Sequence, residues 1–154
     1  MTATLRRMGQ DHAVRNTEGL DQLRELVRRL RDSDLALPVG SGGWTVSSTL
    51  AHVAFWDNVV VERWKQFDQR GAFTDMGDPV LDIVNAAALE QWRALPPRLA
   101  ADQALAAAEA VTARIAGLSA AAIEAAATTG RRFMLDRTIH WAPHLAEIDR
   151  ALSR

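Results

Sequence analysis

The stretch WTVSSTLAHVAFWDNVVVERWKQF, residues 44–67, decides the fold. Its bulky apolar residues recur at spacings of three, four and seven, which places them on one face of an α-helix. They are Val46, Leu50, Val53, Val60, Trp64 and Phe67. Thr45 precedes this run, and its hydroxyl can accept a hydrogen bond from a free backbone N–H of the first turn. We therefore predict a long amphipathic helix that starts at Thr45.

The segments toward both ends of the chain show the same helical period. A first helix is predicted to end before Pro38, and its apolar residues are spaced by three and four: Leu20, Leu23, Val27 and Leu30. An alanine-rich segment after residue 97 strongly favours helix, up to a break at residues 128–130. A last helix is predicted from about residue 133 to residue 152.

A further helix is predicted between these segments. Residues 71–77 form a loop, after which Asp78-Pro79 opens the helix, because proline suits a first turn and aspartate is a favourable cap. Pro96-Pro97 must break or kink it, since proline lacks the N–H that a helix interior needs. No segment alternates apolar and polar residues long enough for a strand. The predicted class is all-α, a four-helix bundle whose third element is broken at Pro96-Pro97.

Composition limits the kinds of protein that this chain can be. Its 154 residues, 48% hydrophobic and 24% charged, suit one domain over residues 1–154 with its own core. The absence of cysteine excludes disulfides, thiolate ligands and a cysteine nucleophile. A net charge of −1 offers no basic surface for nucleic acid. No apolar run approaches the roughly 18–20 residues needed to cross a membrane, and residues 1–10 do not form a signal peptide. We expect a cytoplasmic protein that binds neither nucleic acid nor membrane. Small alanines on the third element let helices approach closely, so a homodimer through that face is compatible with the sequence.

Three histidines are candidates for metal binding. Four residues turn a helix by about 400°, so the rings of His140 and His144 project nearly together, about 6 Å apart along the axis. Both can then reach one ion at about 2.0–2.1 Å. His52, beside the apolar face of the 44–67 helix, can complete a set of three nitrogens with positions left open for water or substrate. The alternative is that each is a core histidine with a hydrogen bond, although two buried imidazoles side by side each need a partner.

The surroundings of the histidine pair leave its local structure open. Pro143 leaves the carbonyl of Ile139 without a helical partner and bends the helix. Either this bend aims the two rings, or the helix starts at Pro143 and His140 lies on a loop. The pair is not the metalloprotease motif, because Trp141 stands where that motif has a glutamate base. A di-iron bundle would need a pair of E-x-x-H segments, and the sequence contains no such pair. The fourth histidine, His12, is expected to be exposed.

Two longer motifs carry a family resemblance. Residues 44–56 contain a tryptophan, a short capping stretch and Leu-Ala-His, with an aromatic about one turn later. Residues 139–148, IHWAPHLAEI, contain a histidine pair followed by Leu-x-x-Ile. These motifs resemble the DinB/YfiT-like superfamily of metalloenzymes, and residues 82–85, DIVN, resemble the start of the third helix in its mycothiol-dependent maleylpyruvate isomerases. The resemblance implies an up-down-down-up four-helix bundle in which His52, His140 and His144 bind a zinc or nickel ion.

The resemblance also implies a chemistry. Better understood relatives use a low-molecular-weight thiol such as mycothiol, so we expect a metal-dependent S-transferase or hydrolase that acts on a small molecule. A dication held by three neutral imidazoles keeps its charge, and it would lower the pKa of bound water to about 7 or bind a thiol as thiolate. Because the chain has no cysteine, the thiol must come from outside. The related isomerases carry a second, C-terminal domain without a counterpart in these 154 residues, which counts against isomerase activity.

Other residues near the histidines in sequence have two interpretations each. Asp57, Glu62 and Asn85 are candidates for handling protons, or they are surface polar residues. Trp56 and Trp141 either wall a pocket or pack in the core. The alternative function is a non-catalytic, small-ligand-binding or stress-associated bundle, whereas neither charge nor motif supports a DNA-associated role.

Overall fold

The computed structural model describes the backbone of residues 3–154 and the side chains of residues 11–154. This part of the chain is all-helical, and its extended pairing is limited to one bridge between Pro38 and Thr45. The predicted all-α class is confirmed. The elements are α1 (Ala3–Arg29), α2 (Asp32–Leu35), α3 (Val46–Arg70), α4 (Asp78–Ala94), α5 (Pro97–Ala116), α6 (Ala120–Thr128), the 3-10 turn η1 (Arg132–Met134) and α7 (Thr138–Leu152).

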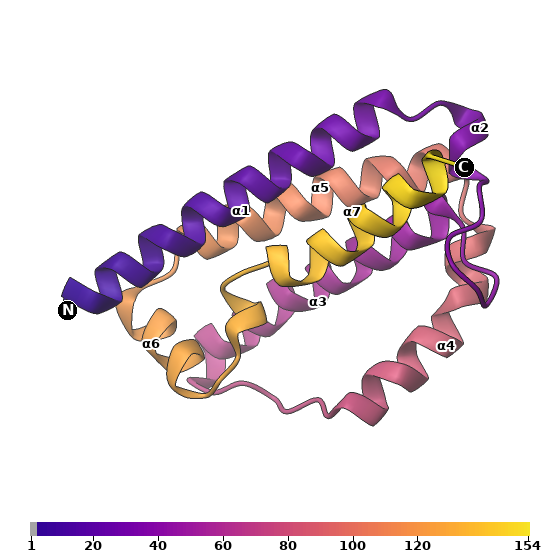
Figure 1. Cartoon of the computed structure of the whole chain (residues 1–154). Coiled ribbons are helices and arrows are strands. Elements are labelled where there is room, and N and C mark those ends of the chain that lie inside the picture. Colours follow the sequence, from indigo (N-terminus) through magenta and orange to yellow (C-terminus); the bar gives the residue numbers. More distant parts are fainter. Residues whose placement is uncertain (1–2) are drawn as a thin grey trace.

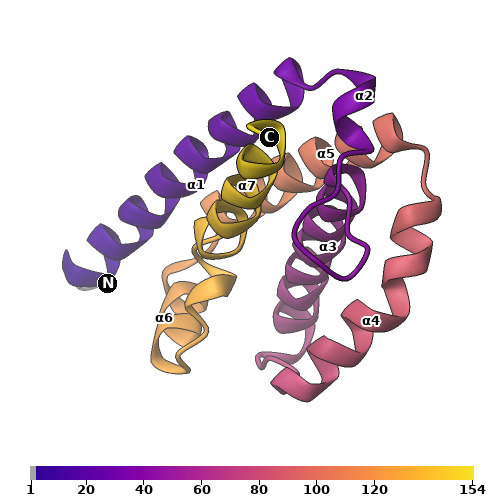
Figure 2. The same cartoon turned by 45° about the vertical axis from the view of Figure 1, so that its right-hand side comes forward.

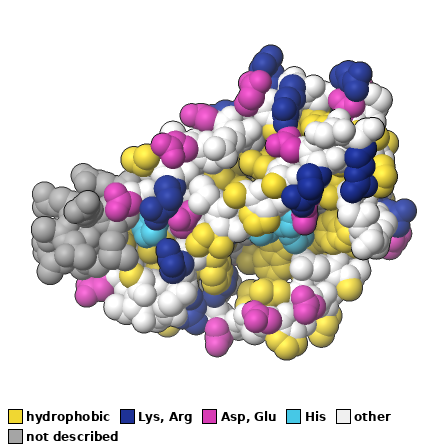
Figure 3. All heavy atoms as spheres, in the orientation of Figure 1, with side chains coloured by type: hydrophobic (Ala, Val, Ile, Leu, Met, Phe, Trp, Pro, Cys, Tyr) yellow, Lys and Arg dark blue, Asp and Glu magenta, His cyan; other side chains and the backbone are white. Residues whose placement is uncertain are grey.

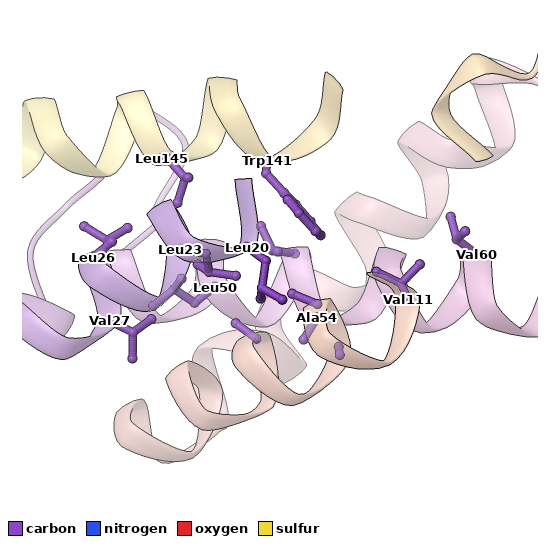
Figure 4. Packing of buried hydrophobic residues seen from close by; sticks show 14 of the residues in the cluster. Leu20, Leu23, Leu26, Val27, Leu50, Ala54, Val60, Val111, Trp141 and Leu145 are labelled. Atoms are coloured by element: carbon purple, nitrogen blue, oxygen red, sulfur yellow. The ribbon is translucent and has the colours of Figure 1, made fainter. Parts of the chain in front are cut away.

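Four long helices share the main core. α3 packs along α5 as the most extensive pair, α1 lies against α5 and α7, and α7 also contacts α3. Leu23, Leu50, Val111 and Trp141, one from each of these helices, are buried and lie in one cluster (Figure 4). Burying one such side chain contributes roughly 1.5–3 kcal/mol. The apolar periodicity of the sequence is thus the pattern of this core.

Alanines line the buried side of α5: Ala100, Ala101, Ala104, Ala107 and Ala108. Small side chains let helices approach closely, which accounts for the extensive packing of α5 on α3. These alanines therefore serve packing within the chain. A homodimer through the alanine-rich element stays a prediction.

The long helices run in two directions. In Figure 1, α1 and α7 run toward the end of the molecule where α2 lies, and α3 and α5 run the opposite way. α4 runs back beside α3 and connects it to α5, and Figure 2 shows α4 on the far side of α3 from α1. The predicted break at Pro96-Pro97 is confirmed, because Pro97 is the first residue of α5, where its missing N–H costs no helical bond.

The start of α3 is stabilised by a reciprocal cap. Thr45 Oγ1 accepts a hydrogen bond from the Ser48 backbone N–H at 3.2 Å, and Ser48 Oγ accepts one from the Thr45 N–H at 2.8 Å. The helix ends at Arg70, and Gly71 follows as its C-terminal cap with a φ of 70°, which favours glycine. The predicted start of this helix is therefore confirmed, and so is the loop that follows it.

Two helix boundaries correct the prediction. The residue before α4 is Gly77, and Asp78 lies inside the first turn without acting as a side-chain cap, although its charge still suits that end of the helix. The alanine-rich segment is interrupted after Gly117, where Ser119 caps a separate helix, α6. None of the described helices is by itself long and apolar enough to cross a membrane; α5 and α6 together meet that test but are bent by 105° at their junction.

The last helix also begins later than predicted. Residues 132–134 form η1, and α7 starts at Thr138. Asp136 is responsible for this turn, since its carboxylate accepts hydrogen bonds from the Thr138 backbone N–H at 3.1 Å and from Arg15 of α1 at 2.7 Å. The chain is thereby tied to α1 just before α7 begins.

Candidate metal centre

Three histidines from two helices converge at one point. His52 of α3 and His140 and His144 of α7 each offer a ring nitrogen, and these three atoms lie within 4.8 Å of one another. The Nε2 atoms of His52 and His140 are 3.1 Å apart. Two nitrogens bound to one ion at about 2.0–2.1 Å would be roughly 2.9–3.4 Å apart in octahedral or tetrahedral geometry. The distance between His52 and His140 therefore fits a shared divalent ion, whereas the 4.8 Å limit for the full set exceeds this range, so the third nitrogen would have to move closer to bind the same ion.

The helical context of the pair is resolved by α7. The helix continues through Pro143, and the His140 backbone N–H donates to the Arg137 carbonyl at 2.9 Å. His140 therefore lies on the helix, and the alternative in which it lies on a loop is wrong. The rings of His140 and His144 stand one turn apart with their centroids at 4.9 Å.

Burial keeps two of these imidazoles neutral. His52 is packed edge-on against Trp44 and Trp92, with ring centroids 5.5 and 5.2 Å away. Burial, together with the nearby charges of His144 and Arg137, lowers the pKa of His52 to about 3. Burial and then Arg137 lower the pKa of His140 to about 2. Both rings are thus uncharged at neutral pH, which is the state that binds a metal.

Hydrogen bonds to the outer ring nitrogens orient the ligands unequally. Glu147 Oε2 lies 3.1 Å from His144 Nδ1 and can accept a hydrogen bond from the N–H at that position, which leaves Nε2 with a free lone pair. His140 has the opposite partner, because the Arg137 guanidinium can only donate to Nδ1, at 3.0 Å. The ring proton of His140 then lies on Nε2, toward His52. An ion at that nitrogen would require the proton to move to Nδ1 and the Arg137 hydrogen bond to open, so that the ring stays neutral.

Arg137 is a site residue that the sequence prediction missed. Its guanidinium is buried at 2% exposure, and it donates from Nε to Asp57 at 2.8 Å and from Nη1 to the Phe133 carbonyl at 3.1 Å. Asp57 also accepts from the Trp141 indole N–H at 2.9 Å. The only signal in the sequence is the position of Arg137 one helical turn before His140. This buried network contacts the histidine cluster through the hydrogen bond from Arg137 to His140.

The remaining candidates divide between the site and other places. Asn85 Oδ1 accepts from Trp56 Nε1 at 2.9 Å, and both side chains line the pocket beside the histidines. Asp57 is buried next to the site, whereas Glu62 is exposed, pairs with Lys65 and does not line the pocket, which supports the alternative that it is a surface polar residue. Trp141 belongs to the core and not to the pocket wall.

His12 also differs from expectation. It is only 6% exposed, and its Nδ1 accepts a hydrogen bond from Arg15 Nη2 at 2.7 Å. The expectation of an exposed side chain is therefore wrong, because α1 is packed on this side against the turn that contains Asp136. His12 does not belong to the histidine cluster.

A pocket of about 390 Å³ opens beside His52 and His140. Its walls come from α3, α4, η1, α7 and the loop before α4, and most of the wall is apolar: Val59, Val60, Met76, Leu81, Phe133 and Ile139. In Figure 3, histidine side chains near the middle of the visible face lie beside a broad hydrophobic area. The candidate metal centre therefore faces a cavity large enough for a small organic molecule.

Comparison with known families gives a match over most of the chain. Residues 17–152 match the family model described as mycothiol maleylpyruvate isomerase N-terminal domain, and this range includes all three clustered histidines. No curated protein matches the chain. No solved structure matches it either.

Proposed function

The chain belongs to the family of the mycothiol maleylpyruvate isomerase N-terminal domain, and on that basis we propose that it is a metal-dependent enzyme that uses or modifies a small thiol. The reaction class that we propose is S-transfer or hydrolysis. The ligands of a zinc or nickel ion would be His52, His140 and His144. One observation carries the proposal: three imidazole nitrogens lie within 4.8 Å of one another beside a largely apolar pocket.

The chain's own residues prepare the site for such chemistry. When bound, a divalent ion held by three neutral imidazoles would supply an undiminished positive charge that stabilises a thiolate or acidifies water. The apolar wall limits water around the reacting group, which strengthens charge interactions there. Trp56 holds the Asn85 carbonyl, so the amide nitrogen of Asn85 is free to donate to a substrate oxygen. Since the chain lacks cysteine, the thiol is a substrate or cosubstrate.

The fold supports the same assignment. We propose that α1, α3, α5 and α7 form the up-down-down-up bundle of the DinB-like proteins, as a single domain over residues 1–154. The opposed helix directions in Figure 1 support this order. α4 would be the crossover between the two parallel helices, and it closes one side of the pocket with Leu81 and Asn85.

Elemental analysis of the purified protein tests the metal site. After incubation with zinc or nickel and removal of free ion, we expect about one equivalent per chain in the wild type and little in His140→Ala. The matched control is His12→Gln, which removes a buried histidine outside the cluster and should keep the metal. If the wild type retains neither ion, the three histidines are core residues and the proposed enzyme function is wrong.

A second experiment separates this proposal from a non-catalytic bundle with a structural metal. A closed structural site couples metal binding to folding, so a chelator would lower the melting temperature greatly. The present site already has its histidines assembled within a packed bundle. We therefore expect the chelator to lower the melting temperature only modestly. A small thiol should bind measurably to the metal-loaded protein and not to the metal-free protein.

A further inference from the structure

Arg63 carries a buried guanidinium whose hydrogen-bonding capacity is only partly used. The residue is 8% exposed and lines the pocket. Its Nη2 donates to the Thr74 carbonyl at 3.0 Å, but its Nε is buried and has no hydrogen-bond partner in the described part of the chain. No ion pair joins it to a carboxylate among those residues. A buried cation without a counter-ion is unfavourable, so the pocket is incomplete at this point.

Two other arginines show that this situation is particular to Arg63. Arg137 lines the same pocket, but its nitrogens are engaged by Asp57, by a backbone carbonyl and by His140. Arg114 resembles Arg63 more closely, because its guanidinium also lies over an aromatic ring and its Nε is also buried without a partner. Arg114 is nevertheless neutralised by Asp68 at 2.6 Å, and it lies outside the pocket.

Aromatic rings hold the Arg63 guanidinium in place. Its Cζ lies 5.4 Å from the centroid of Phe133 and 6.0 Å from that of Phe73. Stacking of this kind stabilises the cation while leaving the N–H groups at its edge available for a planar acceptor. The nearby Arg131 is paired with Asp75 at 3.1 Å. Asp78 lines the pocket without forming an ion pair with Arg63.

The position of Arg63 sets a length for the ligand. His52, Trp56, Val59, Val60 and Arg63 form the α3 wall of the pocket, so the histidine and the arginine bound that wall. Eleven residues advance a helix by about 16 Å, and because both side chains lean toward the helix N-terminus, this rise sets the separation of the two groups. After a contact distance of roughly 3 Å at each end, a span on the order of 10 Å remains for the ligand. The wall along this span is apolar.

We propose that Arg63 is an anion subsite at the end of the pocket remote from the histidines, and that the site takes elongated molecules with an apolar middle and a terminal carboxylate. Which chemical group the ligand carries at its other end, next to the histidines, rests on the proposed function. The carboxylate subsite itself does not require a metal. A carboxylate can accept two parallel hydrogen bonds from the two Nη groups of a guanidinium, which would give Arg63 its counter-ion, while the buried Nε stays out of reach of a ligand. Short dicarboxylates do not span the distance.

Binding to the metal-free full-length protein tests the subsite. Octanoate, which is about as long as the span, is compared with 1-octanol by quenching or enhancement of tryptophan fluorescence, because Trp56 lies in the wall. We expect octanoate to bind at least about tenfold more tightly than octanol, the effect of one charge-assisted contact. In Arg63→Gln the two ligands should bind alike, and octanol should bind as to the wild type. Arg114→Gln should keep the preference.

Equal binding of octanoate and octanol by the wild type would overturn the subsite, whatever the variants show. A preference that persists in Arg63→Gln would assign the carboxylate to another cation and would overturn the role of Arg63. If circular dichroism shows that Arg63→Gln is misfolded, Arg63→Lys replaces it: it keeps the charge without the fork and should lower the preference by severalfold. An unchanged preference in that variant would contradict the bidentate contact.

Chain length provides an independent measurement on the zinc-loaded protein by calorimetry. We expect 8-mercaptooctanoate to bind about tenfold more tightly than octanethiol, and 3-mercaptopropionate to bind no more tightly than propanethiol. An equal carboxylate preference at both lengths would show that the anion is not bound at the remote end. If no thiol binds at all while octanoate still discriminates, the proposed function fails and the subsite stands.

Discussion

Removing one member of the buried ion pair next to the histidines should strongly destabilise the protein. Asp57 and Arg137 are 0% and 2% exposed, and the two charges meet at 2.8 Å. Asp57→Ala removes the only carboxylate that contacts this guanidinium within the described residues and takes the acceptor from the Trp141 indole. A buried arginine is then left without its counter-ion.

The expected loss follows from these two effects. Leaving one member of a buried ion pair uncompensated costs about 3–5 kcal/mol, and an indole N–H without its acceptor adds about 1 kcal/mol or more. We therefore expect Asp57→Ala to lower the free energy of unfolding by about 4–6 kcal/mol. In a chain of this length, each kcal/mol shifts the melting temperature by roughly 2–4 °C. The midpoint should thus fall by at least about 8 °C.

Urea unfolding of the metal-free protein at pH 7, followed by circular dichroism, measures this loss. The double variant Asp57→Ala/Arg137→Met removes both charges and should regain about half of it or more, since an apolar replacement of a buried pair is nearly neutral. Glu62→Ala breaks an exposed pair on the same helix and should leave the midpoint nearly unchanged. A loss below about 1 kcal/mol in Asp57→Ala, or a double variant no more stable than the single one, would refute the reasoning.

Three further outcomes are expected. Gly19→Ala should destabilise the bundle by about 1–3 kcal/mol, although alanine normally favours a helix, because its Cβ would lie 2.8 Å from Thr138 Cγ2; a higher melting temperature would contradict this. The metal-free protein should lose stability as pH falls from about 6.5 toward 3. Burial lowers the pKa of His52 to about 3, so in this pH range only the unfolded chain binds a proton at His52. The slope of unfolding free energy against pH should therefore be flatter in His52→Gln. Glu147→Gln should weaken zinc binding by about 10- to 100-fold in a competition titration, since its carboxylate orients His144; unchanged affinity would show that this hydrogen bond is not used.

The success of the sequence prediction depends on how local each signal is. The start of α3 was predictable because the Thr45 cap and the apolar period lie within a few residues of each other. The interruption after Gly117 was missed although Gly117 and Ser119 are local signals for the end and the start of a helix, because the alanines on both sides favour one continuous helix. The late start of α7 was missed because it depends on an ion pair between Asp136 and Arg15, which are 121 residues apart.

The candidate site shows the same division. His140 and His144 could be paired from their spacing, since four residues bring two side chains together on any helix. His52 was a candidate third ligand from its place beside the apolar face of its helix and from the family resemblance, but its position beside the pair required the packing of α3 against α7. The role of Pro143 was open until the continuous helix placed both rings on one face.

The sequence by itself determined the helical class, the break between α4 and α5, and the residues that could hold an ion, because helical periodicity, proline geometry and ligand chemistry are properties of neighbouring residues. Only the tertiary structure decided which charges are buried and what each one meets. Arg63, Arg137 and His12 are ordinary polar residues in the sequence, and the surrounding helices remove all three from solvent. Burial and pairing depend on segments that are distant in the chain, so the charge pattern of the pocket is a property of the fold.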